Sequence, residues 1–426
     1  MNKRTKTTLR RWCLYGWTLA KWTMAASAIG VVCGLIGTMF HFGVHEVTAF
    51  RGTHPWVLYL LPLAGFVIVS FYKLTETDGL GTDDIIDAVH AGKRLPILLL
   101  PAIFFGTVLT HLCGGSAGRE GAALQMGGTI GQCMGRTFRL DDRDLRVATL
   151  AGMAAFFSAL FGTPLAATVF AIMVISIGVL YHVALYPSLL AALVAYGVSV
   201  RLGVEPTRFT VAVPDQSVGM FVRVAALGVL CALVSILFCK LMHGAGHLMK
   251  RIKNPWLRVI CGGFAVIALT WIFGTDYNGA GMDIVTRAIE QETVAVSWAF
   301  LLKLVFTAVT LAAGFKGGEV VPSFFVGATF GCAVSPLLGL PVGFGAAVGL
   351  AAVFCGVTNC PVASTLLAVE LFGAEGMLYF ALACCLSYML SGYQGLYSSQ
   401  TILYSKLKAQ FINVHTNAYH AGEKTE

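Results

Sequence analysis

The stretch "CGGSAGREGAAL", residues 113–124, places a charged pair, Arg119 and Glu120, among glycines and between two long apolar runs. Glycine disfavours helix because it loses the most conformational freedom on ordering, whereas the "AALQMGGTIG" that follows is compatible with one. We therefore expect a helix to begin near Arg119–Gly121. The first turn of a helix exposes free backbone N–H groups at a positive dipole end, which predicts an anion site that needs no fixed cation.

The composition indicates a membrane protein. Of the 426 residues, 57% are hydrophobic and only 12% are charged, whereas soluble domains carry about a quarter charged residues. Residues 147–200, 320–369 and 376–405 contain no Asp, Glu, Lys or Arg. A helix crosses the bilayer in about 20 residues, so the first two segments are too long for a single crossing. Because an unbroken membrane section must be helical, we expect an all-α polytopic membrane protein.

Basic residues gather at the ends of the apolar segments, including Arg10–Arg11 near the start and Lys250–Arg251 midway. The positive-inside rule makes these places cytoplasmic, and Lys406 with Lys408 indicates a cytoplasmic C-terminus. We expect a multi-pass protein of the inner (plasma) membrane with both termini in the cytoplasm. The net charge of +8 follows this topology and is not a signature of nucleic-acid binding.

The chain repeats itself at an offset of about 200 residues. The repeated blocks are "GLGTD" from Gly79 and "GAGMD" from Gly279, "GREG" from Gly118 and "GGEV" from Gly317, and "GMAAFFSALFGTPLAAT" from Gly152 and "GLAAVFCGVTNCPVAST" from Gly349. This alignment pairs Glu120 with Glu319. It predicts four parts, which are a first repeat half over 1–200, a connecting segment over 201–220, a second half over 221–405, and a short tail over 406–426 without a regulatory domain.

Duplicated membrane chains are typical of transporters and channels, whose site lies at the repeat interface near the bilayer midplane. Helices interrupted by glycine or proline in corresponding positions of the two halves indicate that site. Such interruptions occur here at 114–121 and 314–322, and again at 162–164 and 359–361.

Glu120 is a negative side chain at the predicted anion site. It competes with an anion when it is ionised and withdraws when it is protonated, which describes a proton-coupled gate. The alternative is a carboxylate that caps a helix and pairs with Arg119 at the membrane surface. Glu319 at a second glycine-rich break favours the functional interpretation, because carboxylates inside a membrane are costly and usually functional.

The segments "GREG", "GFKGGEVVP" at 314–322, "GTPLAAT" and "GYQGLYS" around Tyr397 occur in an order that resembles the CLC family of anion channels and anion/proton exchangers. The resemblance covers nearly the whole chain. It implies a CLC-type fold with two inverted-topology repeats per subunit and broken helices at the anion site. It also implies a homodimer with one anion pathway per subunit.

Several positions depart from the chloride-transporting pattern of that family. Leu80 stands where the family's first anion motif has a serine hydroxyl, Met173 stands near the usual intracellular proton-entry acid, and Glu319 replaces an apolar residue. These departures resemble the fluoride-exporting branch, CLC-F. The resemblance therefore implies a fluoride/proton antiporter that exports fluoride from the cytoplasm, with a chloride/proton exchanger or anion channel of the same fold as the alternative.

The resemblance assigns roles to individual residues. Glu120 is the gating, proton-carrying glutamate, Glu319 lies near the central anion position on the proton path, and Tyr397 donates its hydroxyl to the central anion. The residues expected around the anion are Gly79, Leu80, Gly81, Gly118, Arg119, Gly121, Gly318, Val320 and Tyr397. Within that set, Arg119 is expected to be structural and to tie down a loop or carbonyl groups.

Other patterns favour ordinary explanations. Residues 114–118 fit the G-x-S-x-G hydrolase pattern, but no strand or triad partner accompanies Ser116, so an intramembrane enzyme is a remote alternative. His41 and His45 lie four apart on a predicted helix, where an end at the membrane surface is favoured over a metal site. The twelve cysteines show no metal-ligand spacing, and we expect no metal and no cofactor. A purely structural scaffold would leave Glu120 and Glu319 without a role.

Overall fold

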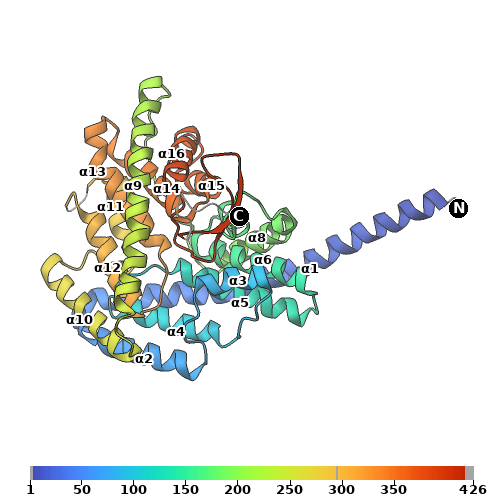
Figure 1. Cartoon of the computed structure of the whole chain (residues 1–426), viewed down its shortest axis with the longest axis horizontal. Coiled ribbons are helices and arrows are strands. Elements are labelled where there is room, and N and C mark those ends of the chain that lie inside the picture. The colour runs from blue at the N-terminus through green and yellow to red at the C-terminus, as the bar shows by residue number, and fades with distance from the viewer. Residues whose placement is uncertain (1–2, 294–295, 418–426) are drawn as a thin grey trace.

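The computed structural model describes residues 3–293 and 296–417, and for residues 3–10 only the backbone. Helices dominate the described ranges (Figure 1). The helices are α1 (Lys3–Thr53), η1 (Pro55–Leu60), α2 (Leu61–Leu74), α3 (Thr82–Ala91), α4 (Leu99–Leu112), α5 (Glu120–Thr137), α6 (Asp142–Phe161), α7 (Pro164–Met173), η2 (His182–Ala184), α8 (Leu185–Arg201), α9 (Val218–Met249), α10 (Pro255–Phe273), α11 (Met282–Glu290), α12 (Ala299–Ala313), α13 (Val320–Leu338), α14 (Val342–Thr358), α15 (Pro361–Phe372) and α16 (Met377–Leu390).

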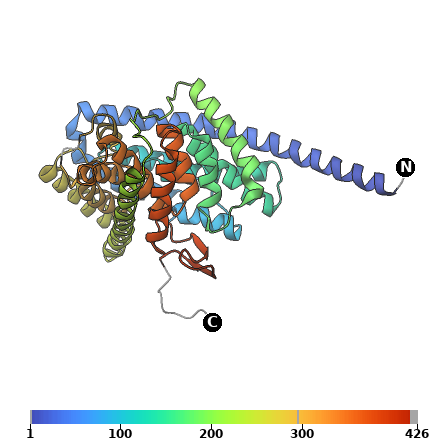
Figure 2. The same ribbon diagram turned by 90° about the horizontal axis from the view of Figure 1, so that it is seen from above.

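Seven helical segments in the described part of the chain are long and apolar enough to cross a membrane, and several shorter apolar helices accompany them. The longest is α1, whose N-terminal part projects away from the other helices while its remainder packs against α8, α6 and α4 (Figure 2). The expectation of a polytopic helical protein is confirmed.

The two halves repeat the same close helix packing. In the first half, a Cβ atom on Gly127 of α5 would lie 2.3 Å from the carbonyl oxygen of Gly152 in α6. In the second half, a Cβ atom on Gly327 of α13 would lie 2.4 Å from the carbonyl oxygen of Gly349 in α14. Both helix pairs thus approach backbone to backbone, which only small residues permit at a helix interface.

The two principal helix breaks meet each other. α5 begins at Glu120 after the glycine-rich segment 113–119, and α13 begins at Val320 after 314–319. Between them, the N–H of Gly118 donates to the carbonyl of Gly318, and the N–H of Gly318 donates to the carbonyl of Gly118, both at 2.7 Å. The bridge is antiparallel, as expected for a twofold relation between inverted halves.

This bridge corrects the alignment of the two glutamates. Gly118 faces Gly318, and α5 and α13 begin at Glu120 and Val320, an offset of 200 residues in each case. Glu120 therefore corresponds to Val320, and Glu319 corresponds to Arg119. The pairing of Glu120 with Glu319 is wrong by one residue because it matched side-chain type, whereas the backbone sets the register.

A second pair of breaks ends α6 and α14. Gly162, with φ of 69°, ends α6 in the left-handed conformation, and Asn359, with φ of 61°, does the same for α14. Each is followed two residues later by a proline, Pro164 or Pro361, at the first position of the next helix, where proline needs no hydrogen bond. The interruptions predicted at 162–164 and 359–361 are confirmed.

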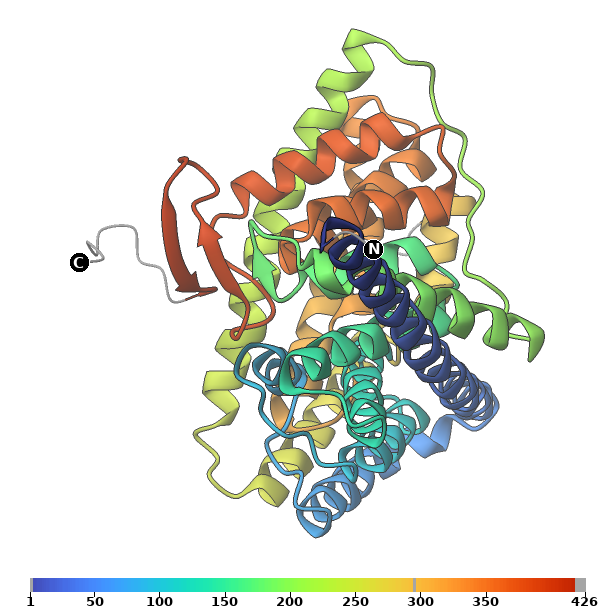
Figure 3. The same ribbon diagram turned by 90° about the vertical axis from the view of Figure 1, so that its right-hand side faces the viewer.

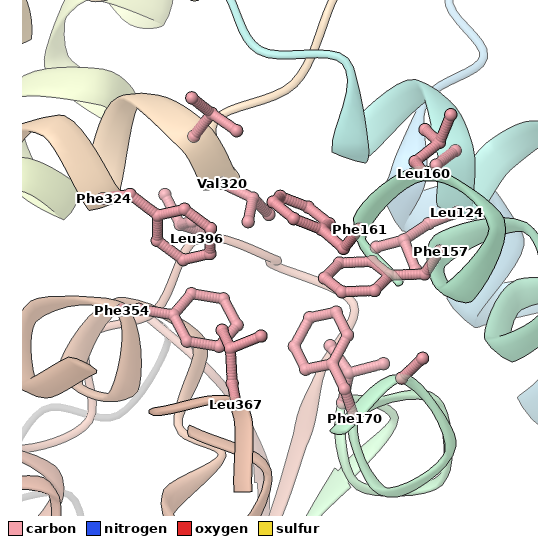
Figure 4. Close-up of a cluster of buried hydrophobic side chains, with 14 of the residues drawn as sticks. Leu124, Phe157, Leu160, Phe161, Phe170, Val320, Phe324, Phe354, Leu367 and Leu396 are labelled. Carbon is pink, nitrogen blue, oxygen red and sulfur yellow. The ribbon is translucent and has the colours of Figure 1, made fainter. Parts of the chain in front are cut away.

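A cluster of aromatic side chains joins the halves (Figure 4). The ring centroids of Phe161 and Phe324 are 5.7 Å apart, those of Phe170 and Phe354 are 5.5 Å apart, and those of Phe324 and Phe354 are 5.1 Å apart. Rings of α6 and α7 thus contact rings of α13 and α14. The side chain of Val320 belongs to the same cluster (Figure 4).

A small sheet departs from a purely helical architecture. Strands β1 (Ser176–Ile177), β2 (Thr401–Tyr404) and β3 (Phe411–His415) pair in that order, β1 with β2 in parallel and β2 with β3 antiparallel. Figure 3 displays the β2–β3 hairpin beside the helices. The strands were missed because they are short and, in an apolar run, periodicity does not separate strand from helix. β3 lies in the predicted tail 406–426, whose last nine residues lie outside the described ranges.

Candidate functional site

Glu120 is the first residue of α5, and its carboxylate turns back over the start of its own helix. Its side chain is 1% exposed. Oε2 accepts a hydrogen bond from the backbone N–H of Arg119 at 2.9 Å, and Oε1 lies 3.3 Å from Nε of Arg119. Arg119 also places Nη1 3.0 Å from Nδ1 of His41. Arg119 contacts Glu120 and His41 here rather than a loop carbonyl, and its structural role remains a prediction.

The glycines at the bridge have no N–H group to offer an anion in this conformation. Gly118 and Gly318 donate to each other, so their predicted role as anion ligands requires the bridge to open. The free donors lie in the first turns of the helices that follow these glycines, because the first-turn N–H groups of a helix have no intrahelical partner. In α5 and α13 these include the N–H groups of Gly121 and Val320.

A first cavity of about 500 Å³ lies on the Glu120 side of the bridge. Glu120, Arg119 and His41 line it, together with Arg51 and Gly281 at the start of α11. Arg51 donates to the carbonyl of His111 at 2.5 Å. Cationic groups from α1 and from the start of α5 thus line the cavity together with the buried carboxylate of Glu120 and the less buried Asp276 and Asp283.

A second cavity of about 270 Å³ contains most of the other predicted residues. Its lining includes Gly79, Leu80, Gly81, Glu319 and Tyr397. The structure therefore brings the first motif, the second glutamate and the tyrosine to one place, although they are widely separated in the sequence. Glu120 faces the other cavity.

The start of α3 presents different donors from those predicted. Leu80 donates its N–H to the carbonyl of Thr77 at 3.2 Å, and Gly81 donates its N–H to Oδ2 of Asp84 at 3.0 Å. The first-turn N–H groups without an intrahelical partner include those of Thr82 and Asp83, and both residues line the second cavity. These two residues were missed because a sequence does not reveal which N–H groups of a turn are already bonded.

Tyr397 carries a hydroxyl that is available to a ligand. Its side chain is 3% exposed, and Oη has no hydrogen-bond partner within the described part of the chain. A buried phenol without a partner is costly. It is the feature expected of a group that hydrogen-bonds to a bound species.

Glu319 reaches across the bridge to the other half. It is the N-cap residue of α13, yet its side chain forms no capping hydrogen bond. Its Oε2 lies 3.6 Å from where a Cβ atom on Gly121 would stand. The carboxylate thus lies beside the first turn of α5. A Cβ atom at 121 would collide with Cα of Gly318, 2.7 Å away, so it is the backbone of the second half that requires glycine here. Val320, by contrast, turns its side chain into the aromatic cluster, so only its backbone can contact an anion.

Several polar residues that sequence reasoning missed hold the Tyr397 loop. Thr416 donates to the carbonyl of Tyr397 at 2.5 Å, and Asn417 makes two hydrogen bonds with Gly395, at 3.0 and 3.1 Å. Gln400 donates to the carbonyl of Thr358, which ends α14, at 3.0 Å. Their signal in the sequence is weak, because isolated amides and hydroxyls near a chain end resemble any solvated tail.

The alternative chemistry receives no support from geometry. The hydroxyl of Ser116 hydrogen-bonds to that of Thr307 at 3.0 Å, and the backbone N–H of Ser116 donates to Oγ1 of Thr310 at 3.1 Å, so neither partner is a base. His41 and His45 stack with ring centroids 6.4 Å apart, while Nδ1 of His41 faces Arg119. His41 and His45 thus belong to the lining of the first cavity. Ser116 belongs to the contact between its loop and α12.

Comparisons with known proteins agree with this geometry. The family model described as "Voltage gated chloride channel" matches residues 63–392. The chloride/fluoride channel protein of Pseudomonas syringae pv. tomato is 38% identical over 400 residues, which cover 91% of this chain and 88% of that protein.

Solved structures match as well. A CLC-type fluoride/proton antiporter superposes with a TM-score of 0.88 at 32% identity, covering 91% of this chain and 99% of that one. A slow cyanobacterial Cl⁻/H⁺ antiporter superposes with a TM-score of 0.75 over 87% of this chain and 94% of that one, at 19% identity, which supports the fold alone. The chain therefore belongs to the CLC family, the voltage-gated chloride channel family of multi-pass membrane proteins.

Proposed function

We propose that this protein is an antiporter that exports fluoride from the cytoplasm in exchange for protons. The observation that carries the proposal is the placement of two carboxylates, Glu120 and Glu319, in separate cavities on either side of the Gly118–Gly318 bridge. Coupling of ion movement to protons across such a constriction needs groups that change charge, and a carboxylate on each side can serve this purpose. The named activities of the chloride/fluoride channel protein and of the fluoride/proton antiporter support fluoride and protons as the transported ions.

Glu120 acts as the gate. When it is ionised, its carboxylate occupies the positive start of α5 and excludes an anion from that position. When it is protonated, it loses its attraction for Arg119 and vacates the helix start, so that the first-turn N–H groups receive the anion in its place. The ionised carboxylate and the anion therefore compete for the same position at this helix start. An anion can enter only when Glu120 has bound a proton, and this couples the two ions.

Glu319 and Tyr397 form the centre of the pathway in this proposal. The phenol of Tyr397 donates a hydrogen bond to the anion, and the carboxyl of Glu319, directed at the start of α5, accepts the proton that Glu120 releases. A protonated Glu319 also donates a hydrogen bond to fluoride, whereas an ionised one repels it. Occupancy of the central position thus depends on the protonation of Glu319.

Selectivity for fluoride follows from the size and hardness of the ion. Fluoride loses a large hydration energy on entry, so it needs short hydrogen bonds from O–H and N–H donors. Leu80 supplies no hydroxyl where a chloride-selective site has a serine, and this removes a donor placed for a larger ion. The remaining donors are the phenol of Tyr397 and the backbone at the starts of α3, α5 and α13.

The same proposal covers location and assembly. We place the protein in the inner (plasma) membrane with both termini cytoplasmic, because basic residues follow the ends of the apolar segments. We propose a homodimer in which each subunit has its own pathway, with repeat halves over 1–200 and 221–405 joined by 201–220. Exposed apolar side chains on α9 and α10, such as Leu233 and Phe264, provide surface for lipid or for a second subunit.

The test is an efflux measurement in liposomes. Purified protein is reconstituted in vesicles loaded with equal concentrations of fluoride and chloride, and both ions are followed together with external pH. Fluoride should leave far faster than chloride and should drive proton uptake. Equal rates, or faster chloride efflux with proton coupling, would replace the proposal with the chloride/proton exchanger, and efflux without proton movement would indicate a channel.

A further inference from the structure

The second cavity contains another buried phenol that the gate and the centre do not use. Tyr72 of α2 is 1% exposed and lines this cavity. Its Oη has no hydrogen-bond partner among the residues that the structure describes. Tyr72 and Tyr397 are thus two buried phenols in one cavity, and neither hydroxyl has a hydrogen-bond partner in residues 3–293 and 296–417.

Lys316 lies beside Tyr72. Its Nζ is 4.1 Å from the centroid of the Tyr72 ring, and the residue lines the same cavity. The base of the side chain is held in place, since the backbone N–H of Lys316 donates to Oγ1 of Thr110 at 3.2 Å and the side-chain stem contacts Gly106. The ammonium is therefore positioned at the cavity.

The nearest carboxylates, Asp78 and Asp84, act on this ammonium through space but form no ion pair with it. Asp84 pairs with Lys93 at 2.5 Å and accepts from Gly81, and Asp83 accepts from the N–H of Ser399 at 3.0 Å. Within the described ranges, no carboxylate oxygen lies within 4.0 Å of Nζ of Lys316. A half-buried cation that only contacts a ring keeps most of its attraction for an anion.

We propose that Tyr72 and Lys316 form an additional anion site in the second cavity, at which fluoride binds before it reaches Tyr397. The site offers one phenol O–H and an ammonium with three N–H donors, the kinds of donor that a small, hard anion prefers. The first-turn N–H groups of Thr82 and Asp83 line the same cavity and contribute positive potential. This proposal rests on the proposed fluoride transport and adds an entry site to it.

An anion site explains why residues 72 and 316 carry polar groups, which packing alone does not require. A phenylalanine at 72 would fill the same space without an orphan hydroxyl, and a methionine at 316 would pack against the ring without bringing a charge into the cavity. Each polar group is costly to bury unless a ligand satisfies it. A site occupied during transport removes that cost when fluoride is bound.

The test compares Tyr72→Phe, Lys316→Met and the double variant with the unmodified protein. Fluoride binding is measured by isothermal titration calorimetry with sodium fluoride in detergent, and fluoride efflux is measured in liposomes. Each single variant should weaken fluoride binding and raise the half-saturating concentration, by about tenfold for the loss of a charge-assisted hydrogen bond. Maximal efflux and proton coupling should change little. The double variant should lose less than the product of the single effects, because the two groups share one ligand.

Three further variants serve as controls. Lys73→Met removes a lysine from the next position of the chain, which is exposed and stacks on Trp256 with Nζ 3.7 Å from the ring centroid. Tyr59→Phe removes a hydroxyl that lies outside the cavity and bonds to Trp271. Both should bind fluoride as the unmodified protein does. Lys316→Arg retains the charge and should keep most of the affinity.

The outcomes separate this proposal from the proposed function. Unchanged affinity in Tyr72→Phe and Lys316→Met overturns the entry site and leaves fluoride transport standing. The same conclusion follows if the variants lose maximal rate and thermal stability at constant affinity, since that is a packing effect. If the unmodified protein neither binds nor moves fluoride, the proposed function fails, and the entry site fails with it.

Discussion

Replacing Glu319 with glutamine should nearly abolish transport and leave stability almost unchanged. The side chain forms no capping hydrogen bond and, within the described residues, no ion pair. Its charge interacts with the α13 dipole, which contributes about 0.3–1 kcal/mol to folding. Glutamine has nearly the same volume, so no void is created. A group that transfers protons contributes about 10²–10⁴-fold to a rate, so proton-coupled fluoride efflux should fall at least about 100-fold.

Glu370 provides a matched control because its carboxylate is a true helix cap. Oε1 and Oε2 accept hydrogen bonds from the N–H groups of Leu165 and Ala166 at the start of α7, at 3.1 and 2.8 Å. Glu370→Gln should therefore lose about 1–2 kcal/mol of stability, as for other cap losses, with transport retained per folded protein.

The assay measures the two variants in parallel. Thermal unfolding is followed in detergent, and fluoride efflux with external pH is followed in liposomes that contain equal amounts of folded protein. The reasoning predicts opposite patterns, with transport lost in Glu319→Gln and stability lost in Glu370→Gln. Near-normal efflux in Glu319→Gln with a lowered melting temperature would refute the assignment of Glu319 to the pathway.

Three further results are expected. Glu120→Gln should keep its fold but abolish proton uptake driven by a fluoride gradient, because the amide cannot ionise; coupling that persists would make Glu120 a structural cap. Thr416→Val should remove one of the two hydrogen bonds to the carbonyl of Tyr397, which also accepts from the N–H of Gln400 at 3.2 Å, and should lower fluoride affinity by about the 0.5–1.5 kcal/mol of one hydrogen bond, with Thr416→Ser restoring it; calorimetry measures the change. Gly131→Ala should lower the melting temperature, since the added Cβ would lie 2.1 Å from a carbonyl oxygen of α6, at an overpacking cost of about 1–3 kcal/mol, whereas Gly197→Ala, with open space, should not.

The sequence by itself determined the class of the protein and the local features of the site. The uncharged apolar segments required a helical membrane fold, and the repeated blocks required two related halves. The glycine-rich breaks also placed the start of α5 at Glu120, because glycine and proline act on the backbone where they stand. These conclusions depend on composition or on a few neighbouring residues, and such information is present in the chain before it folds.

Only the tertiary structure decided how the parts of the site face one another. The Gly118–Gly318 bridge joins positions 200 residues apart, and its register makes Glu319 the repeat counterpart of Arg119 rather than of Glu120. The two glutamates line different cavities, one on each side of this bridge. The N–H groups of Gly118 and Gly318, which the motifs suggested as anion ligands, are hydrogen-bonded to each other in the bridge. Hydrogen bonds between distant backbone groups leave no trace in side-chain type, so no motif could reveal them.

The same reason explains the residues that the sequence did not single out. Tyr72 resembles any aromatic residue of an apolar helix, and Thr416 resembles any polar residue of a tail. Tyr72 is significant because its buried hydroxyl has no hydrogen-bond partner within the described residues. Thr416 is significant because it donates a hydrogen bond to the carbonyl of Tyr397. Whether a buried polar group is satisfied depends on every element packed around it, and that is decided only when the two halves close on each other.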